Sequence, residues 1–129
     1  MKLLALFLSV VSMMVSVAML SHNDNPLDGK RFSITIVSSN DDNMKTPEEL
    51  IFRGGKVDAP VCHLYGFQAA SYQTVNNAGV ISFSFTNDSE DEGTLYFTGM
   101  VNGEKICGTY LWKKEGREDL VYRFEGALN

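Results

Sequence analysis

The sequence is poor in the residue types that most catalytic and metal sites use. Its 129 residues include only two histidines and two cysteines. Two histidines do not support a Ser-His-Asp set, and no G-x-S-x-G motif, phosphate-binding loop or dinucleotide fingerprint is present. A zinc site needs three or four converging ligands, and only the neighbouring pair Cys62 and His63 is visible. We therefore expect no cofactor and interpret the chain as a non-enzyme.

Basic side chains are also few. The 11 Lys and Arg residues face 16 Asp and Glu residues, which gives a net charge of −5. Binding to a phosphate backbone needs a stripe of Lys and Arg, so this balance argues against a nucleic-acid partner. The one local basic cluster, residues 113–117, is interrupted by an acid and a glycine, and we interpret it as a hairpin tip.

The first twenty residues lack Gly, Pro, Asp, Glu and Arg, and Lys2 is their only charge. The apolar run 3–17 and the small residues at 16–18 predict a signal peptide, residues 1–18, that is cleaved after Ala18. The protein is then exported, to the periplasm or the medium, without a membrane span. A retained membrane anchor is the alternative, because the apolar run approaches the roughly twenty residues that cross a bilayer.

Alternation of apolar and polar side chains dominates the rest of the chain. Residues 19–27 are polar and predict a flexible leader before one domain at 28–129. Seven or eight short strands, separated by turn signals, predict an all-β antiparallel meander that closes into a small barrel or half-barrel. Strands are expected at 32–36, 50–52, 57–61, 67–74, 81–86, 95–101, 106–112 and 121–128, a polar loop at 38–46, and turns at 76–79 and 102–103.

Several strands carry a glycine in their interior. Gly99 and Gly126 each follow an inward aromatic residue by two positions, and Gly108 sits inside its own strand. Glycine at such positions lets a sheet bend sharply, or lets a neighbouring aromatic ring lie over bare backbone. We therefore interpret these glycines as packing devices.

An ordered set of motifs along the chain resembles a known group of proteins. The set is Cys62-His63-Leu64-Tyr65-Gly66-Phe67, Ala70-Ser71-Tyr72, Ile81-Ser82-Phe83, Phe97-x-Gly99-x-Val101-x-Gly103, Gly108-x-x-x-Trp112 and Tyr122-x-Phe124-x-Gly126. It resembles a family of small exported bacterial proteins, common in the Bacteroidetes, that are similar to lipocalin-like (calycin) barrels. The resemblance implies a single-domain meander whose interior holds a small apolar ligand.

The candidate ligand contacts are the bulkiest residues at the alternate strand positions that are expected to point into the barrel. If the barrel has a cavity these side chains line it, and if it has none they fill it. They are Trp112, Tyr110, Phe97, Phe83 and Tyr122. Three further residues, Tyr72, Tyr96 and Arg123, have the opposite parity and are expected on the outer surface.

The two cysteines leave two alternatives open. A bridge between Cys62 and Cys107 would close a loop of about 45 residues and stabilise the fold by roughly 4 kcal/mol. Two unpaired thiols packed as small apolar groups are the other. Neighbouring residues on a strand point to opposite faces, so Cys62 and His63 are not expected to form a catalytic pair.

An acidic turn is the one weak metal candidate. Asp88, Glu90 and Glu92, followed by a glycine, resemble the first half of a calcium loop. Gly99 stands where the bidentate acid of such a loop belongs, and a solvated hairpin tip is the alternative.

These observations predict an exported β-barrel that acts by binding. The leading hypothesis is a module that holds a small apolar ligand. The alternative is a filled barrel, with no cavity, that works through its surface as a structural or envelope interaction protein.

Overall fold

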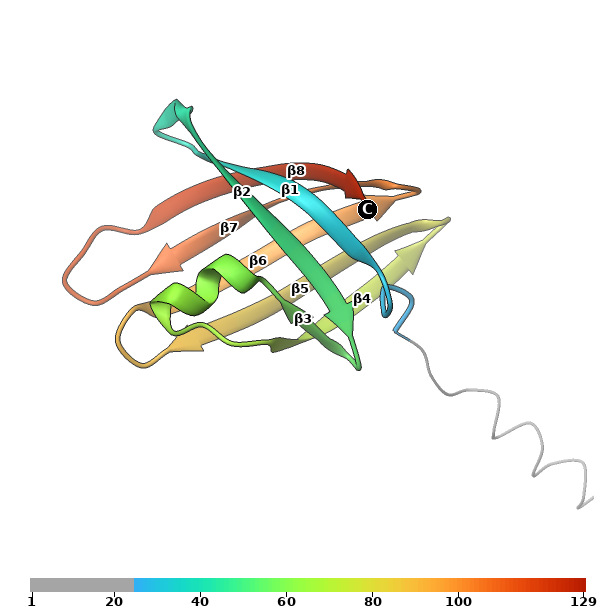
Figure 1. Ribbon diagram of the computed structural model, residues 1–129, viewed down its shortest axis with the longest axis horizontal. Coiled ribbons are helices and arrows are strands. Elements are labelled where there is room, and N and C mark those ends of the chain that lie inside the picture. Colours follow the sequence, from blue (N-terminus) through green and yellow to red (C-terminus); the bar gives the residue numbers. More distant parts are fainter. Residues whose placement is uncertain (1–24) are drawn as a thin grey trace, which may run out of the picture.

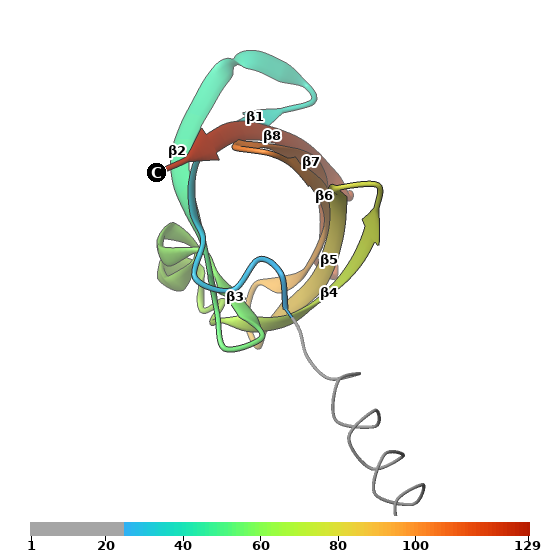
Figure 2. The ribbon, with the colours of Figure 1, turned by 90° about the vertical axis from the view of Figure 1, so that its right-hand side faces the viewer.

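Eight antiparallel strands form one closed barrel in residues 25–129, the part of the chain that the computed structural model describes (Figure 1). Each strand pairs with the next along the chain, and β1 pairs with β8 to close the ring (Figure 2). The elements are β1 (Arg31–Ser38), β2 (Asp41–Arg53), β3 (Lys56–Asp58), the 3-10 helix η1 (Pro60–Tyr65), β4 (Ala70–Asn77), β5 (Val80–Ser89), β6 (Gly93–Asn102), β7 (Lys105–Lys113) and β8 (Leu120–Leu128). The predicted all-β barrel is confirmed, whereas the predicted signal peptide lies outside the described residues.

Strand β2 is much longer than the sequence pattern predicts. The segment 38–46, whose polar side chains predict a loop, belongs mostly to β2, which begins at Asp41. Val37 pairs with Lys45, so the hairpin extends well beyond the apolar residues. The side chains of residues 41–47 are all exposed, and a strand that is exposed throughout carries no alternation of apolar and polar residues.

The predicted strands 57–61 and 67–74 are displaced by a helix. Strand β3 ends at Asp58, and η1 begins at Pro60, because proline lacks the N–H that a sheet ladder needs but suits a first helical turn. Strand β4 then begins at Ala70, and residues 66–69 connect η1 to the sheet. No helix among the described residues is long and apolar enough to cross a membrane.

Aromatic rings fill the middle of the barrel. Phe52 is 1% exposed and makes edge-to-face contacts with three neighbours. Its ring centroid lies 5.9 Å from that of Phe32, 5.0 Å from that of Tyr72 and 5.4 Å from that of Phe83. Tyr72 is 5% exposed, so the prediction that it faces outward is wrong: in β4 the buried side chain is that of Tyr72, which packs on Phe52.

Two of the five candidate ligand contacts belong to this packed middle. Phe83 and Phe97 are each 3% exposed, and both rings pack against Phe124, with centroids 6.5 Å and 5.9 Å apart. Phe97 also stacks on Phe85 at 4.3 Å. The centre of the barrel is therefore filled by its own side chains.

Two paired glycines make room for these rings. Gly99 of β6 lies opposite Gly108 of β7. A Cβ atom on Gly99 would lie 2.5 Å from Cζ of Phe83, and one on Gly108 would lie 2.6 Å from Cζ of Phe124. Both rings thus rest on bare backbone, the second of the two roles that the glycine pattern left open.

The segment before β1 closes one end of the barrel. Leu27 was predicted to be the last residue of a flexible leader, but its side chain is fully buried. The folded domain therefore starts before residue 28. Asp28 accepts hydrogen bonds from the Tyr72 hydroxyl, at 2.6 Å, and from the Gly55 N–H, at 3.0 Å. Burial and the contact with Asp28 raise the pKa of Tyr72, which keeps the hydroxyl protonated as a donor.

Candidate functional site

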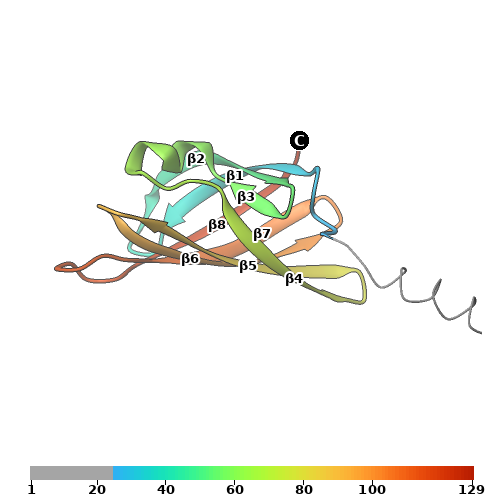
Figure 3. The same cartoon turned by 90° about the horizontal axis from the view of Figure 1, so that it is seen from below.

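A small cavity lies near the opposite end of the barrel, and η1 covers one side of it. Helix η1 lies at this end beside β2 (Figure 3). Its volume is about 170 Å³, and its walls come from η1 and from β1, β2, β6, β7 and β8. The residues that line it are Ile36, Thr46, Glu48, Val61, Cys62, Tyr65, Phe67, Leu95, Tyr110, Trp112 and Tyr122. A dry cavity of about 150 Å³ holds a benzene molecule, so this space has room for one aromatic ring with a short substituent.

The wall formed by η1 is fixed to the rest of the barrel. Gly66 has a φ of +83°, a left-handed conformation that glycine adopts readily, and it ends the helix. The Ser89 hydroxyl donates to the Tyr65 carbonyl at 2.7 Å. The Asn87 amide donates to the Gln68 carbonyl at 2.6 Å. The cavity is therefore preformed by contacts between η1, its connecting segment and β5.

A buried carboxylate forms part of the cavity wall. Glu48 of β2 is only 6% exposed. Its Oε1 accepts the backbone N–H groups of Glu49, at 2.7 Å, and Val61, at 3.2 Å, and the second bond joins η1 to β2. Its Oε2 is buried without a hydrogen-bond partner among the described residues. Such an atom is costly to bury without a donor, and Glu48 is among the residues that line the cavity.

The thiol of Cys62 lies beside this carboxylate. Burial raises the pKa of Cys62 to about 12, and the negative charge of Glu48 and hydrogen bonding between the two groups add to the effect. A thiol is a weak donor, and the contact leaves Glu48 Oε2 without a hydrogen bond of normal geometry. Cys62 is therefore a protonated, weakly polar wall of the cavity.

Two tyrosine rings, Tyr110 and Tyr122, lie between the packed core and the cavity. Tyr110 stacks on Phe97, with ring centroids 4.5 Å apart, and on Tyr122, with centroids 4.8 Å apart. Burial raises the pKa of Tyr110 above its ordinary value, with smaller contributions from Cys62 and Tyr122. Both phenol rings line the cavity, and the Tyr110 hydroxyl stays protonated at neutral pH.

Trp112 is held in a fixed orientation at the rim. Its indole N–H donates to the Glu92 carbonyl at 2.6 Å. The Arg117 guanidinium lies 4.4 Å from the ring centroid, in a cation–π contact. Tyr65 and Phe67 meet the same ring edge to face, with centroids 5.9 Å and 6.2 Å away. The indole is thus preorganised as a wall of the cavity.

The structure divides the five candidate ligand contacts into two groups. Tyr110, Trp112 and Tyr122 line the cavity, whereas Phe83 and Phe97 are buried in the core beneath it. Cys62, predicted only as a disulfide partner or a core residue, joins the first group.

No family model, curated protein or solved structure matches the chain. The chemistry of the cavity therefore has to be argued from its own residues.

The bridge between Cys62 and Cys107 is not formed. Both thiols are free. Cys107 of β7 lies opposite Met100 of β6, and its side chain is exposed on the outer face of the sheet. Cys62 instead lies in η1 and lines the cavity. Of the alternative, two unpaired thiols packed as small apolar groups, the unpaired state fits both residues, but Cys107 is exposed and is not packed.

The two thiols are expected to react at very different rates. At pH 8 a thiol with a pKa of about 12 is ionised to only about one part in 10⁴, and the thiolate is the reactive form. We predict that iodoacetamide modifies Cys107 at least about 100-fold faster than Cys62 in the folded protein. Peptide mapping of the time course measures both rates, and Cys107→Ser should remove the fast phase. Equal rates would contradict the raised pKa of Cys62.

The carboxylates of the acidic turn, the weak calcium candidate, pair with other residues in the structure. Among the described residues no group of three or more His, Cys, Asp or Glu side chains is arranged to hold a metal ion. Asp88 accepts the Thr94 hydroxyl at 2.8 Å, and Glu92 pairs with Lys114 at 2.8 Å. Asp88 and Glu92 therefore each have a separate partner, an arrangement compatible with the alternative of a hairpin tip.

His63 does not join the cavity. Its Nε2 lies 2.6 Å from Oδ1 of Asp58, the last residue of β3, and both side chains are partly exposed. His63 is not among the residues that line the cavity, and the raised pKa of Cys62 opposes thiolate formation. This arrangement gives no positive evidence of catalytic activity.

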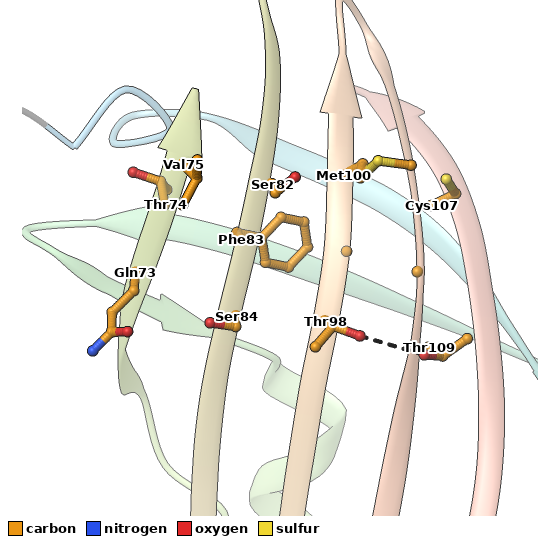
Figure 4. Close-up of a pocket in the computed structure, with 12 residues that line it drawn as sticks. Gln73, Thr74, Val75, Ser82, Phe83, Ser84, Thr98, Met100, Cys107 and Thr109 are labelled. Atoms are coloured by element: carbon orange, nitrogen blue, oxygen red, sulfur yellow. Dashed lines mark hydrogen bonds between the residues drawn. The ribbon is translucent and has the colours of Figure 1, made fainter. Parts of the chain in front are cut away.

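A larger hollow lies on the outer surface of the barrel (Figure 4). Its volume is about 550 Å³, and it runs over β4, β5, β6 and β7. Small hydroxyl residues cover much of it, with Thr98 and Thr109 3.5 Å apart, and Met100 and Cys107 lie at one end. This hollow is open, and none of its side chains carries a buried polar atom without a partner.

Glu48, the most distinctive residue of the cavity, was not predicted. The sequence does contain a signal for its direction. Glu48, Leu50 and Phe52 are alternate residues of β2, so Glu48 points inward as the other two do. Because Pro47 and the polar residues before it are not typical of a strand, the sequence did not predict that β2 includes Glu48. The inward position of its carboxylate was therefore not predicted either.

Proposed function

We propose that the protein is a non-enzymatic binding module that holds a small molecule at the end of the barrel covered by η1. The observation that carries the proposal is the preformed cavity of about 170 Å³ in a barrel that is otherwise packed. Aromatic side chains surround it, and Trp112 and Tyr110 are fixed by contacts of their own. Concave, mostly aromatic sites with a few polar groups are typical of small-molecule binding.

The lipocalin-like resemblance supports the same proposal in a modified form. A lipocalin-like barrel holds its ligand in the barrel interior, but here Phe52, Phe83 and Phe97 occupy the centre. We therefore place the ligand at the end of the barrel and expect it to be small. Export to the periplasm or the medium, argued from residues 1–18, completes the proposal.

The filled barrel that acts through its surface is the second candidate. The hollow over β4–β7 favours it, because Val75 and Met100 expose 68% and 48% of their surface there. An envelope protein would be the partner in that case. We rank it second because the outer hollow lacks an unsatisfied polar group that would give a ligand or partner a fixed position.

Native mass spectrometry of the protein exported by a bacterial host tests the proposal. We expect a small excess mass under native conditions that disappears on denaturation. Filling the cavity with Cys62→Phe should abolish the excess mass while Cys107→Phe, on the outer face, should leave it unchanged. An excess mass that survives in the Cys62 variant and is lost in the Cys107 variant would favour the outer hollow instead.

A further inference from the structure

We infer that the ligand of this cavity is a small organic cation, an aromatic or aliphatic amine whose ammonium group binds Glu48. This inference rests on the proposed function and specifies the chemical class of the ligand.

The first argument is the free acceptor. Glu48 Oε1 is already bonded to the backbone N–H groups of Glu49 and Val61, which accounts for the structural role of the side chain. Oε2 takes no part in that role: it is buried without a hydrogen bond of normal geometry, and the neighbouring Cys62 thiol is only a weak donor. A carboxylate has only acceptor sites, so the group that satisfies Oε2 must be a donor, and a charged donor gives the stronger bond.

The second argument is the charge of the cavity. Of the residues that line it, the titratable ones are Glu48, Cys62, Tyr65, Tyr110 and Tyr122, each of which is neutral or negative. No Lys, Arg or His side chain is among the lining residues. Arg117 packs on the ring of Trp112 and is not part of the lining. A ligand with a positive charge therefore meets a counter-charge and no cationic group among the lining residues.

The third argument is the aromatic wall. The rings of Tyr65, Tyr110, Trp112 and Tyr122 surround the space next to the carboxylate. The π-electrons of such rings attract a cation placed over them, and the attraction increases when water is excluded. Aromatic rings together with one carboxylate are a combination that selects amines over neutral or acidic molecules.

The cavity volume limits the size of the amine. About 170 Å³ accommodates one six-membered ring with a short chain, so benzylamine is a suitable probe. Benzyl alcohol has almost the same shape without the charge, and benzoate carries the opposite charge. The chain has a single tryptophan, Trp112, so its fluorescence reports binding at this site directly.

The test is a fluorescence titration of the purified protein with the three probes at neutral pH, where benzylamine is protonated. We expect benzylamine to bind about tenfold or more tighter than benzyl alcohol, and benzoate to bind weakest. Glu48→Gln keeps a carbonyl that can accept the Val61 N–H but removes the charge, and it should abolish the preference for the amine. Glu49→Gln removes a charge from the next residue, which pairs with Arg31 outside the cavity, and should leave the preference intact.

The outcomes separate this inference from the proposed function. Equal binding of benzylamine and benzyl alcohol to the wild-type protein would overturn the inference and leave a binding site for neutral rings. A similar loss of the preference for benzylamine in the Glu48 and Glu49 variants would also overturn it. The preference would then come from the overall negative charge of the protein and not from Glu48. No response to any of the probes would overturn both. The wild-type comparison stands even if Glu48→Gln fails to fold.

Discussion

Replacing Phe52 by alanine will lower the free energy of unfolding by about 3–5 kcal/mol. The side chain is 1% exposed, and its ring is in edge-to-face contact with Phe32, Tyr72 and Phe83. These four side chains come from β1, β2, β4 and β5, so the ring joins strands from both sides of the barrel. Its removal leaves a cavity that the closed sheet cannot collapse to fill.

Urea denaturation followed by circular dichroism measures this loss. The control is Tyr96→Ala, which removes an aromatic residue of β6 that is 44% exposed on the outer face. That variant should lose no more than about 1 kcal/mol, the range of strand propensity effects. Similar losses in both variants would show that Phe52 is not the packing centre of the barrel.

Replacing Trp112 by alanine will abolish the uptake of small molecules while the barrel stays folded. The indole forms one wall of the cavity and also fixes Tyr65 and Phe67 beside it. Aromatic anchors of this kind contribute a large share of the binding energy of a site. Because Trp112 is only partly buried, we expect a loss of stability of about 1–3 kcal/mol, smaller than for Phe52.

The excess mass in native mass spectrometry gives the result, with Trp112→Phe as the matched variant. Phenylalanine keeps an aromatic wall but cannot donate to the Glu92 carbonyl, so binding should fall by less than about tenfold. Full uptake by Trp112→Ala would contradict the position of the ligand proposed here.

The barrel could be predicted from the sequence because most strands have one buried and one exposed face. In β6, for example, Leu95, Phe97 and Val101 are buried and Tyr96 is exposed, as their alternation indicates. The turn at 76–79 was also predicted from its residue types. The structure confirms it, because Ala78 and Gly79 adopt positive φ angles of 54° and 89°. The turn expected at residues 102–103 lies one position later, because Asn102 still pairs with Lys105 in the sheet.

The parts that could not be predicted depend on long-range contacts. Leu27 looks like part of a polar leader, and it is buried only because the end of the barrel is there to receive it. The exposed half of β2 is a strand because β1 pairs with it, although its side chains contact no core.

The candidate site was predictable only in part. Inward parity identified Tyr110, Trp112 and Tyr122, but it also selected Phe83 and Phe97, because parity gives the direction of a side chain and not its depth along the barrel. Whether an inward ring fills space or borders it depends on the neighbouring strands and, in this barrel, on η1.

Chemical-shift mapping by NMR, with benzylamine and benzyl alcohol as probes, tests the central claim that the end of the barrel covered by η1 is a binding site. We predict the largest changes at the backbone amides of Val61 and Cys62 and at the indole N–H of Trp112. Changes centred on Thr98, Met100 and Thr109 would place binding on the outer surface instead. Either that pattern or the absence of any change would contradict the account.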